Sequence, residues 1–246
     1  MGRRLRFEPD EGARRVGAAG IFAELAPTTL AALADEMIWS AFEPGEQILS
    51  HADASAEFYI LSEGEIEVRL DSPIGRGLYV RRLRAGAHFG ELASLTGARR
   101  SVTLVAASAV VAGSITEASF QLMLRQHASF AARLAIDLAH SVVHLTERVY
   151  EFAALETRFR LYGQVLRLAN GALEEGGEIV IAPAPTHAEL AEMIGAQREA
   201  VTRELNYLVR EGVLRLERAR IVIVDMDRLT GMFAKRAGQT PRSGLG

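Results

Sequence analysis

A short motif at residues 89–93, followed by Arg100 and Ser101, combines a carboxylate, a guanidinium and a glycine-opened turn between segments with strand character. Gly90 lets the backbone approach a ligand closely, so that its N–H groups can reach a phosphate. Arg100, ten positions after Gly90, offers a planar fork of donors to phosphate oxygens. Glu91 can accept a hydrogen bond from a ribose hydroxyl. These residue types at this spacing can hold a cyclic phosphate together with its sugar.

A second motif, at residues 186–208, has the pattern of two short helices joined by a tight turn. Thr186 and Glu189 fit a capping box, which satisfies free N–H groups at the start of a helix. Gly195 permits a sharp turn between the helices. The second helix carries an apolar stripe for packing, made of Val201, Leu205 and Leu208. The sequence therefore predicts a helix-turn-helix.

Three charged residues near the start of the second helix can read base edges in a DNA major groove: Arg198, Glu199 and Arg203. Arginine bonds guanine O6 and N7 together, and glutamate accepts from cytosine N4. Apolar runs at 213–216 and 221–224 predict a hairpin, which would be the wing of a winged helix-turn-helix. The alternative is an ordinary helical hairpin with a solvated charged face, and no strong N-cap precedes the second helix.

Composition and charge limit the classes of function. The chain has 246 residues, enough for two domains, with 49% apolar and 24% charged residues. Its net charge of −3 means that nucleic-acid binding has to come from a local surface. It has no cysteine, no secretory signal, no stretch near the ~18 apolar residues of a membrane span, and no nucleophile–base pair, P-loop or metal cluster. We expect a cytoplasmic protein that is not an enzyme and holds no metal.

The first half of the chain has the pattern of short strands. Residues 1–20 lack a clear period and are predicted to be a mobile tail, as are residues 235–246 at the other end. Helical spacing covers residues 21–38. Short runs closed by glycine or turn residues predict strands at 38–42, 58–61, 66–70, 78–83, 102–105 and 110–114. A hairpin signal at 62–65 lies between two of them, and the whole pattern predicts a small antiparallel β-roll over 21–125.

A long helical stretch over 126–156 follows. Its apolar residues alternate between spacings of four and three: Ala131, Ala135, Leu138, Val142, Leu145, Val149 and Phe152. A seam of this length needs a partner helix, and a parallel homodimer supplies one, although burial within its own domain is the alternative. Residues 157–234 hold the DNA-reading motif. The expected fold class is α+β, with an N-terminal antiparallel β-roll, a long central dimerisation helix and a C-terminal winged helix-turn-helix.

These motifs occur in the order found in the cyclic-AMP receptor (catabolite activator) branch of the CRP/FNR superfamily of transcription regulators, which the chain resembles from residue 21 to about residue 233. Residues 89–101, here called the cassette, resemble the phosphate-binding cassette of cyclic-nucleotide-binding domains. The resemblance implies a homodimeric regulator whose Arg198, Glu199 and Arg203 read a palindromic operator in double-stranded DNA. Its half-sites would be TGTGA-like and about one helical turn apart. It also implies a contact with RNA polymerase.

The same resemblance implies which residues contact the nucleotide. Ribose and phosphate would meet Gly90, Glu91, Leu92, Arg100 and Ser101, and the purine would meet Thr146 on the central helix. Leu145 departs from the family, which often has a hydroxyl there. The implied effector is cyclic AMP. Cyclic GMP stays open, because a hydroxyl directly after the cassette arginine is associated with guanine in the related kinase domains.

Alternatives remain at each level. Glu91 and Arg100 could form a structural ion pair, Ser101 could cap a strand, and Thr146 could simply pack. Within the superfamily, the effector could be a haem-bound gas or another small molecule, although such a ligand does not need a Glu91–Arg100 pair. A different class is a cyclic-nucleotide-binding regulatory subunit of a kinase or channel, which would lack the helix-turn-helix.

Overall fold

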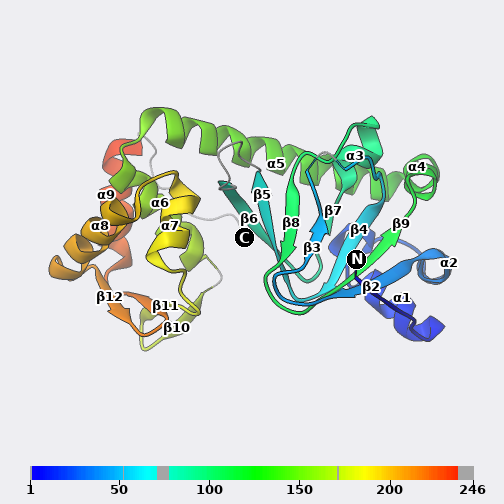
Figure 1. The fold of residues 1–246 in the computed structure, drawn as a ribbon, viewed down its shortest axis with the longest axis horizontal. Coiled ribbons are helices and arrows are strands. Elements are labelled where there is room, and N and C mark those ends of the chain that lie inside the picture. The colour runs from blue at the N-terminus through cyan, green and yellow to red at the C-terminus, as the bar shows by residue number, and fades with distance from the viewer. Residues whose placement is uncertain (1, 52, 71–77, 171, 238–246) are drawn as a thin grey trace. The chain divides into compact units, whose positions relative to one another are not determined.

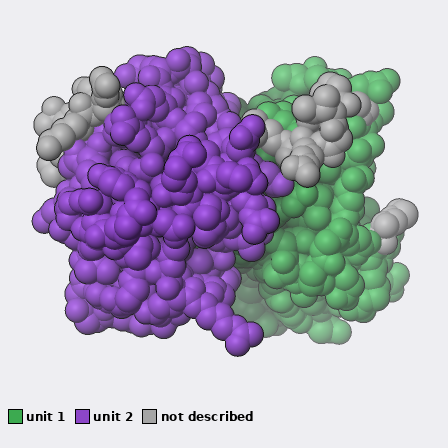
Figure 2. Space-filling model, turned by 60° about the vertical axis from the view of Figure 1, so that its left-hand side comes forward, with its two compact units in different colours: residues 1–141 green, residues 142–246 purple. Residues whose placement is uncertain are grey.

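The computed structural model describes residues 2–51, 53–70, 78–170 and 172–237. The chain forms two compact units, residues 1–141 and 142–246, and each is described by itself (Figures 1 and 2). The predicted α+β class is confirmed. None of the helices in the described residues combines the length and the hydropathy that crossing a bilayer requires.

The first unit consists of strands flanked by helices (Figure 1). Its strands are β1 (Arg3–Leu5), β2 (Ile38–Phe42), β3 (Gln47–Leu49), β4 (Phe58–Glu63), β5 (Glu65–Leu70), β6 (Leu78–Arg84), β7 (His88–Phe89), β8 (Thr103–Ala106) and β9 (Val110–Ile115). Its helices are α1 (Pro9–Gly17), a one-turn 3₁₀ helix (Gly20–Phe22), α2 (Pro27–Glu36), α3 (Glu91–Thr96), α4 (Glu117–Gln126) and the first part of α5 (Ala128–Ala154). The predicted helical stretch over 21–38 is thus divided, since α2 begins at Pro27.

Two antiparallel sheets form the predicted roll. Their strand orders are β1-β2-β9-β4-β7 and β3-β8-β5-β6. The hairpin predicted at 62–65 is wrong, because β4 pairs with β7 and β9 whereas β5 pairs with β6 and β8. The chain passes between the sheets at Gly64, which has φ of +87°. A Cβ atom there would lie 2.1 Å from the Ala109 carbonyl oxygen, so only glycine fits.

Alternating apolar residues divide the interior of this unit into two cores. One lies in the roll and is formed by residues such as Leu61, Ile66, Phe89, Leu104 and Ala112. The other lies between the larger sheet and the helices, where aromatic rings of Phe22, Phe58, Phe120 and Phe130 pack on one another. The second core fixes α4 and the start of α5 to β4 through Phe58.

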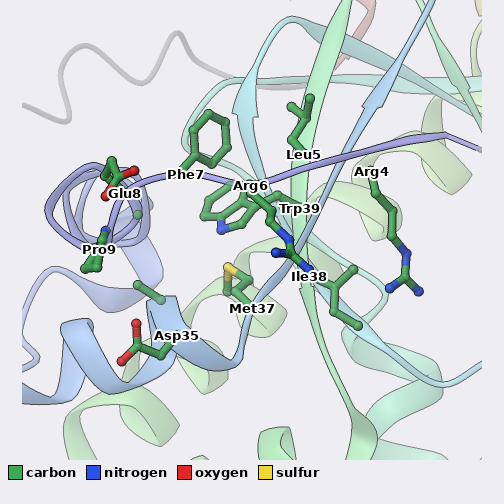
Figure 3. A pocket seen from close by; sticks show the side chains of 12 residues that line it. Arg4, Leu5, Arg6, Phe7, Glu8, Pro9, Asp35, Met37, Ile38 and Trp39 are labelled. Carbon is green, nitrogen blue, oxygen red and sulfur yellow. The ribbon is translucent and has the colours of Figure 1, made fainter.

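The N-terminal residues are structured, so the prediction of a mobile tail is wrong for residues 3–17. Strand β1 pairs with β2, and α1 begins at Pro9, packs on α2 and buries Val16. Arg15 donates to Ser62 Oγ at 2.9 Å. Between β1, α2 and β2 lies a cavity of about 350 Å³, in which the rings of Phe7 and Trp39 meet edge to face (Figure 3). No cassette residue lines it.

The second unit contains the rest of α5 and the remaining elements. They are α6 (Thr157–Ala169), β10 (Leu173–Glu175), β11 (Glu178–Ile181), α7 (His187–Ile194), α8 (Arg198–Arg210), β12 (Leu214–Glu217), β13 (Arg220–Ile223) and α9 (Met226–Ala237). The four strands form a sheet in the order β10-β11-β13-β12. Helix α6 packs against α7, α8 and α9, and α8 packs against β12. Residues 235–237 of the predicted C-terminal tail belong to α9, and residues 238–246 lie outside the described residues.

Candidate ligand-binding site and nucleic-acid interface

Gly90 opens the cassette, defined as residues 89–101. It is the N-cap of α3 and has φ of +85°. A Cβ atom at this position would lie 2.7 Å from Arg100 Nη1 and 2.7 Å from the Glu57 carbonyl oxygen. Both the left-handed backbone and the close approach therefore require glycine, as expected for a backbone that turns tightly around a ligand.

Arg100 is almost completely buried, and its guanidinium makes hydrogen bonds to two other segments of the chain. Nε donates to Ser55 Oγ at 3.1 Å, Nη1 to the Gly90 carbonyl at 3.0 Å and Nη2 to the Glu57 carbonyl at 2.9 Å. The backbone N–H of Arg100 donates to the Asp53 carbonyl at 3.1 Å. Arg100 thus holds the loop before β4 against the start of α3.

The carboxylate that faces Arg100 belongs to Glu57, whose Oε2 lies 3.4 Å from Arg100 Nη2. The sequence suggested a structural ion pair between Glu91 and Arg100. The structure has this pair between Glu57, just before β4, and Arg100. Ser55 and Glu57 were missed from the sequence because they contact Arg100 across 45 and 43 positions of the chain. The one local signal for Ser55 and Glu57 was their place as polar residues directly before an apolar strand.

Helix α3 places Glu91, Leu92 and Ser94 in different environments. Glu91 is half-buried in its first turn, where the helix N-terminus favours a carboxylate. Leu92 is exposed, as is Ser101 beyond the helix. Ser94 is fully buried, and its Oγ donates to the Ala56 carbonyl at 2.7 Å. This bond fixes α3 to the same loop that Arg100 holds.

Tyr59 packs against two residues of the cassette, Phe89 and Arg100. Its ring stacks on Phe89 with centroids 4.9 Å apart, and the Arg100 guanidinium carbon is 5.7 Å from its centroid. Burial raises the pKa of Tyr59, and the charges of Glu57 and Asp53 act in the same direction, whereas Arg100 opposes them. The charges of Glu57 and Asp53 therefore reach the same ring as the charge of Arg100.

His88 precedes the cassette in β7, and its ring stacks on Phe58 with centroids 5.7 Å apart. Burial lowers the pKa of His88, while the nearby carboxylates of Glu91 and Asp137 act to raise it. Across the described ranges, no three metal-ligating side chains gather in one place. His88 is thus a packed aromatic residue at the edge of the cassette.

Thr146 lies on the part of α5 that belongs to the second unit, whereas the cassette belongs to the first. It is exposed, and its Oγ1 donates to the Val142 carbonyl one turn earlier at 2.9 Å. Its expected contact with a purine stays a prediction.

The helix-turn-helix has the geometry that its sequence predicts. Thr186 and Glu189 form the capping box of α7. Gly195 ends α7 in the left-handed conformation, with φ of +59°, and α8 begins three residues later at Arg198. Gln197 precedes α8 without a side-chain cap, as the sequence indicated. The apolar stripe of α8 is buried: Val201, Leu205 and Leu208.

Arg198, Glu199 and Arg203 are all exposed on α8. Within the described ranges, neither guanidinium is paired with a carboxylate, so both are available to an incoming ligand. Other polar residues of α8 point inward. The Tyr162 hydroxyl of α6 donates to Glu204, and His187 Nδ1 of α7 lies 2.8 Å from Thr202 Oγ1. These contacts fix α8 on the unit while its charged face stays free.

The predicted wing is the hairpin of β12 and β13, whose turn has Ala219 at φ of 56°. Arg215 on β12 binds Glu178 on β11 through two hydrogen bonds, at 3.0 and 2.6 Å. Arg220 binds Glu175 at 2.7 Å. These exposed pairs link the strands, while the backbone pairing of β13 with β11 holds the hairpin on the rest of the sheet.

The end of α5 is tied to the helix-turn-helix turn. Arg148 Nη2 donates to the Met193 carbonyl, near the end of α7, at 2.7 Å. Glu151 is buried and accepts from Arg167 Nη1 of α6 at 2.6 Å. A Cβ atom on Gly195 would lie only 2.9 Å from the Phe152 ring. These contacts hold this part of α5 against the turn between α7 and α8.

Two domain families match the chain: the cyclic nucleotide-binding domain at residues 39–127 and the Crp-like helix-turn-helix domain at residues 159–232. The CRP-like cAMP-activated global transcriptional regulator of Mycobacterium tuberculosis is 24% identical over 212 residues, or 86% of this chain and 95% of that protein. A CRP/FNR-family transcriptional regulator from Thermus thermophilus shares 27% identity with a TM-score of 0.66, covering 80% of this chain and 99% of that structure.

A likeness in fold alone extends to the c-di-GMP responsive global regulator CLP of Xanthomonas campestris, with a TM-score of 0.71 and 16% identity over 82% of this chain and 100% of that one. The matched domains and their geometry define a DNA-binding transcription regulator with a cyclic-nucleotide-binding domain, which is not an enzyme. The chain belongs to the CRP/FNR superfamily of transcription regulators.

Proposed function

We propose that the regulator responds to cyclic AMP, with cyclic GMP as a second candidate. The observation that carries this proposal is the meeting of Gly90 and Arg100 across a glycine-opened turn, inside a region that matches the cyclic nucleotide-binding domain. The name of the Mycobacterium tuberculosis relative, a cAMP-activated regulator, supports the same effector. Absence of any cysteine excludes a cysteine-ligated iron–sulfur sensor.

The proposed nucleotide contacts are those that the family resemblance implies. Phosphate and ribose meet Gly90, Glu91, Leu92, Arg100 and Ser101. The exposed Ser101 hydroxyl follows the cassette arginine directly and is free to accept or donate. Thr146 is proposed to meet the purine, and this assignment rests on the family resemblance.

The proposed DNA target is a palindromic, TGTGA-like operator. The exposed Arg198, Glu199 and Arg203 at the start of α8 match the donors and acceptors that guanine and cytosine edges require. Action on such an operator, in contact with RNA polymerase, implies a cytoplasmic protein.

The proposed active form is a homodimer joined through α5. Its heptad residues Val142, Leu145 and Val149 are 62%, 53% and 68% exposed, and an apolar seam of this kind is buried by an equivalent helix. Nucleotide binding would favour one arrangement of the dimer over another. The ties from Arg148 and Phe152 to the helix-turn-helix turn give that shift a route to α8.

A second candidate function is regulation by an effector without a phosphate. It is favoured by one observation: the guanidinium of Arg100 already bonds to Ser55, Gly90 and Glu57 of its own chain.

Calorimetric titration with cyclic AMP and with cyclic GMP distinguishes the two candidates. The first predicts saturable heat at one nucleotide per protomer for at least cyclic AMP. Absence of binding heat for both nucleotides would contradict it and leave the second candidate.

A further inference from the structure

Within the described residues, Glu57 is the side chain that places a negative charge on Arg100. Its Oε2 lies 3.4 Å from Nη2, and the Glu57 side chain is 43% exposed whereas that of Arg100 is 3% exposed. The guanidinium is therefore almost closed to solvent, whereas the carboxylate next to its Nη2 reaches solvent. A phosphate that enters from solvent and binds Nη2 has to compete with the Glu57 carboxylate for that nitrogen.

The contacts of Arg100 differ in how readily they can be exchanged. Two acceptors are backbone carbonyls, of Gly90 and Glu57, and the third is the hydroxyl of Ser55. The carbonyls cannot leave without moving the chain. The Glu57 carboxylate is on a half-exposed side chain and can leave by rotating about its own single bonds, at little cost in structure.

A carboxylate and a phosphodiester cannot both stay next to one guanidinium hydrogen, because both are anions and both are acceptors. The first has to be displaced before the second binds. The affinity for the phosphate is then reduced by the fraction of molecules in which the carboxylate occupies the nitrogen.

On this geometry we propose that Glu57 is a built-in competitor for the phosphate subsite: its carboxylate occupies Arg100 until a cyclic nucleotide displaces it, and it thereby sets the effector concentration at which the regulator responds. This inference rests on the proposed function, since it assumes an effector with a phosphate. It assigns to Glu57, which lies outside the cassette sequence, control of effector affinity.

The test is calorimetric titration of the full-length protein with cyclic AMP, comparing the wild type with Glu57→Gln and Glu57→Ala. Both variants remove the charge, and the glutamine keeps an uncharged acceptor of similar size. Both should bind about fivefold more tightly, which corresponds to about 1 kcal/mol, the upper end for a partly exposed ion pair. The gain should shrink at high salt, because screening weakens the competing pair.

Glu24→Gln is the matched control, because Glu24 is exposed, lies outside the cassette and loses the same charge. Its affinity should equal that of the wild type, and circular dichroism should show all variants folded. If the wild type binds cyclic AMP and both Glu57 variants bind equally or more weakly, the inference is wrong while the proposed function stands. If no variant binds either cyclic AMP or cyclic GMP, the proposed function falls and this inference with it.

Discussion

Replacing Arg100 with leucine should destabilise the first unit as well as remove its phosphate-binding group. The substitution leaves two backbone carbonyls, those of Gly90 and Glu57, without the donors that now lie at 3.0 and 2.9 Å. It also removes the donor to Ser55 Oγ at 3.1 Å. A buried acceptor that loses its donor costs about 1–3 kcal/mol, and partial access of water places the sum at about 2–4 kcal/mol. Leucine adds no polar group in return.

Trp39 makes this loss measurable in the intact protein. It is the single tryptophan of the chain and is buried in the core of the first unit, so its fluorescence reports unfolding of that unit. With an m-value of about 2 kcal/mol/M in urea, the midpoint should fall by about 1–2 M. Arg100→Lys keeps the charge but not the fork, and should fall between the wild type and Arg100→Leu.

Arg125→Leu serves as the control, because Arg125 is an exposed arginine in the last turn of α4, outside the cassette. Its midpoint should stay close to that of the wild type. If Arg100→Leu unfolded at the same urea concentration as this control, Arg100 would not hold the loop before β4 against α3, and the description of the cassette would be wrong.

Three further substitutions, one of them with a matched control, test the second unit and the proposed dimer. Gly195→Ala should lower stability by about 1–3 kcal/mol in thermal unfolding, because alanine is strained at φ of +59° and its Cβ meets Phe152 at 2.9 Å. Gly231→Ala, with open space around it inside α9, should not lower it, and equal effects of the two would refute the reasoning. Arg203→Ala should cost about 1–3 kcal/mol of discrimination at one operator base pair, measured by competition between operator variants; undiminished discrimination would remove Arg203 from the reading face. Val149→Glu should convert the dimer to monomers in analytical ultracentrifugation, and a dimer that persisted would mean that α5 is not the interface.

The helix-turn-helix could be predicted from the sequence because its signals are local. A capping box joins Thr186 to Glu189 within one turn, and a left-handed turn needs one glycine, Gly195. The strand positions of the roll were also largely predicted, since turn residues close most of them. Gly90 was recognised for the same reason.

Features that depend on distant segments could not be predicted. Ser55 and Glu57 reach Arg100 only because the loop before β4 folds onto α3. The hairpin at 62–65 was wrong because a turn sequence does not say in which sheet the next strand pairs. Residues 1–20 looked disordered because they are rich in glycine, alanine and charge. Yet Arg15 of α1 finds partners 47 and 48 positions away, in Ser62 and Glu63.

The regulator is proposed to couple nucleotide binding to operator binding within one protein. This coupling is tested most directly by fluorescence anisotropy of a labelled palindromic TGTGA operator, titrated with the protein with and without saturating cyclic AMP at fixed salt. With the nucleotide present, the operator should bind much more tightly, and the nucleotide affinity should rise by the same factor when the operator is present. Equal operator affinity with and without both cyclic AMP and cyclic GMP would contradict the coupling.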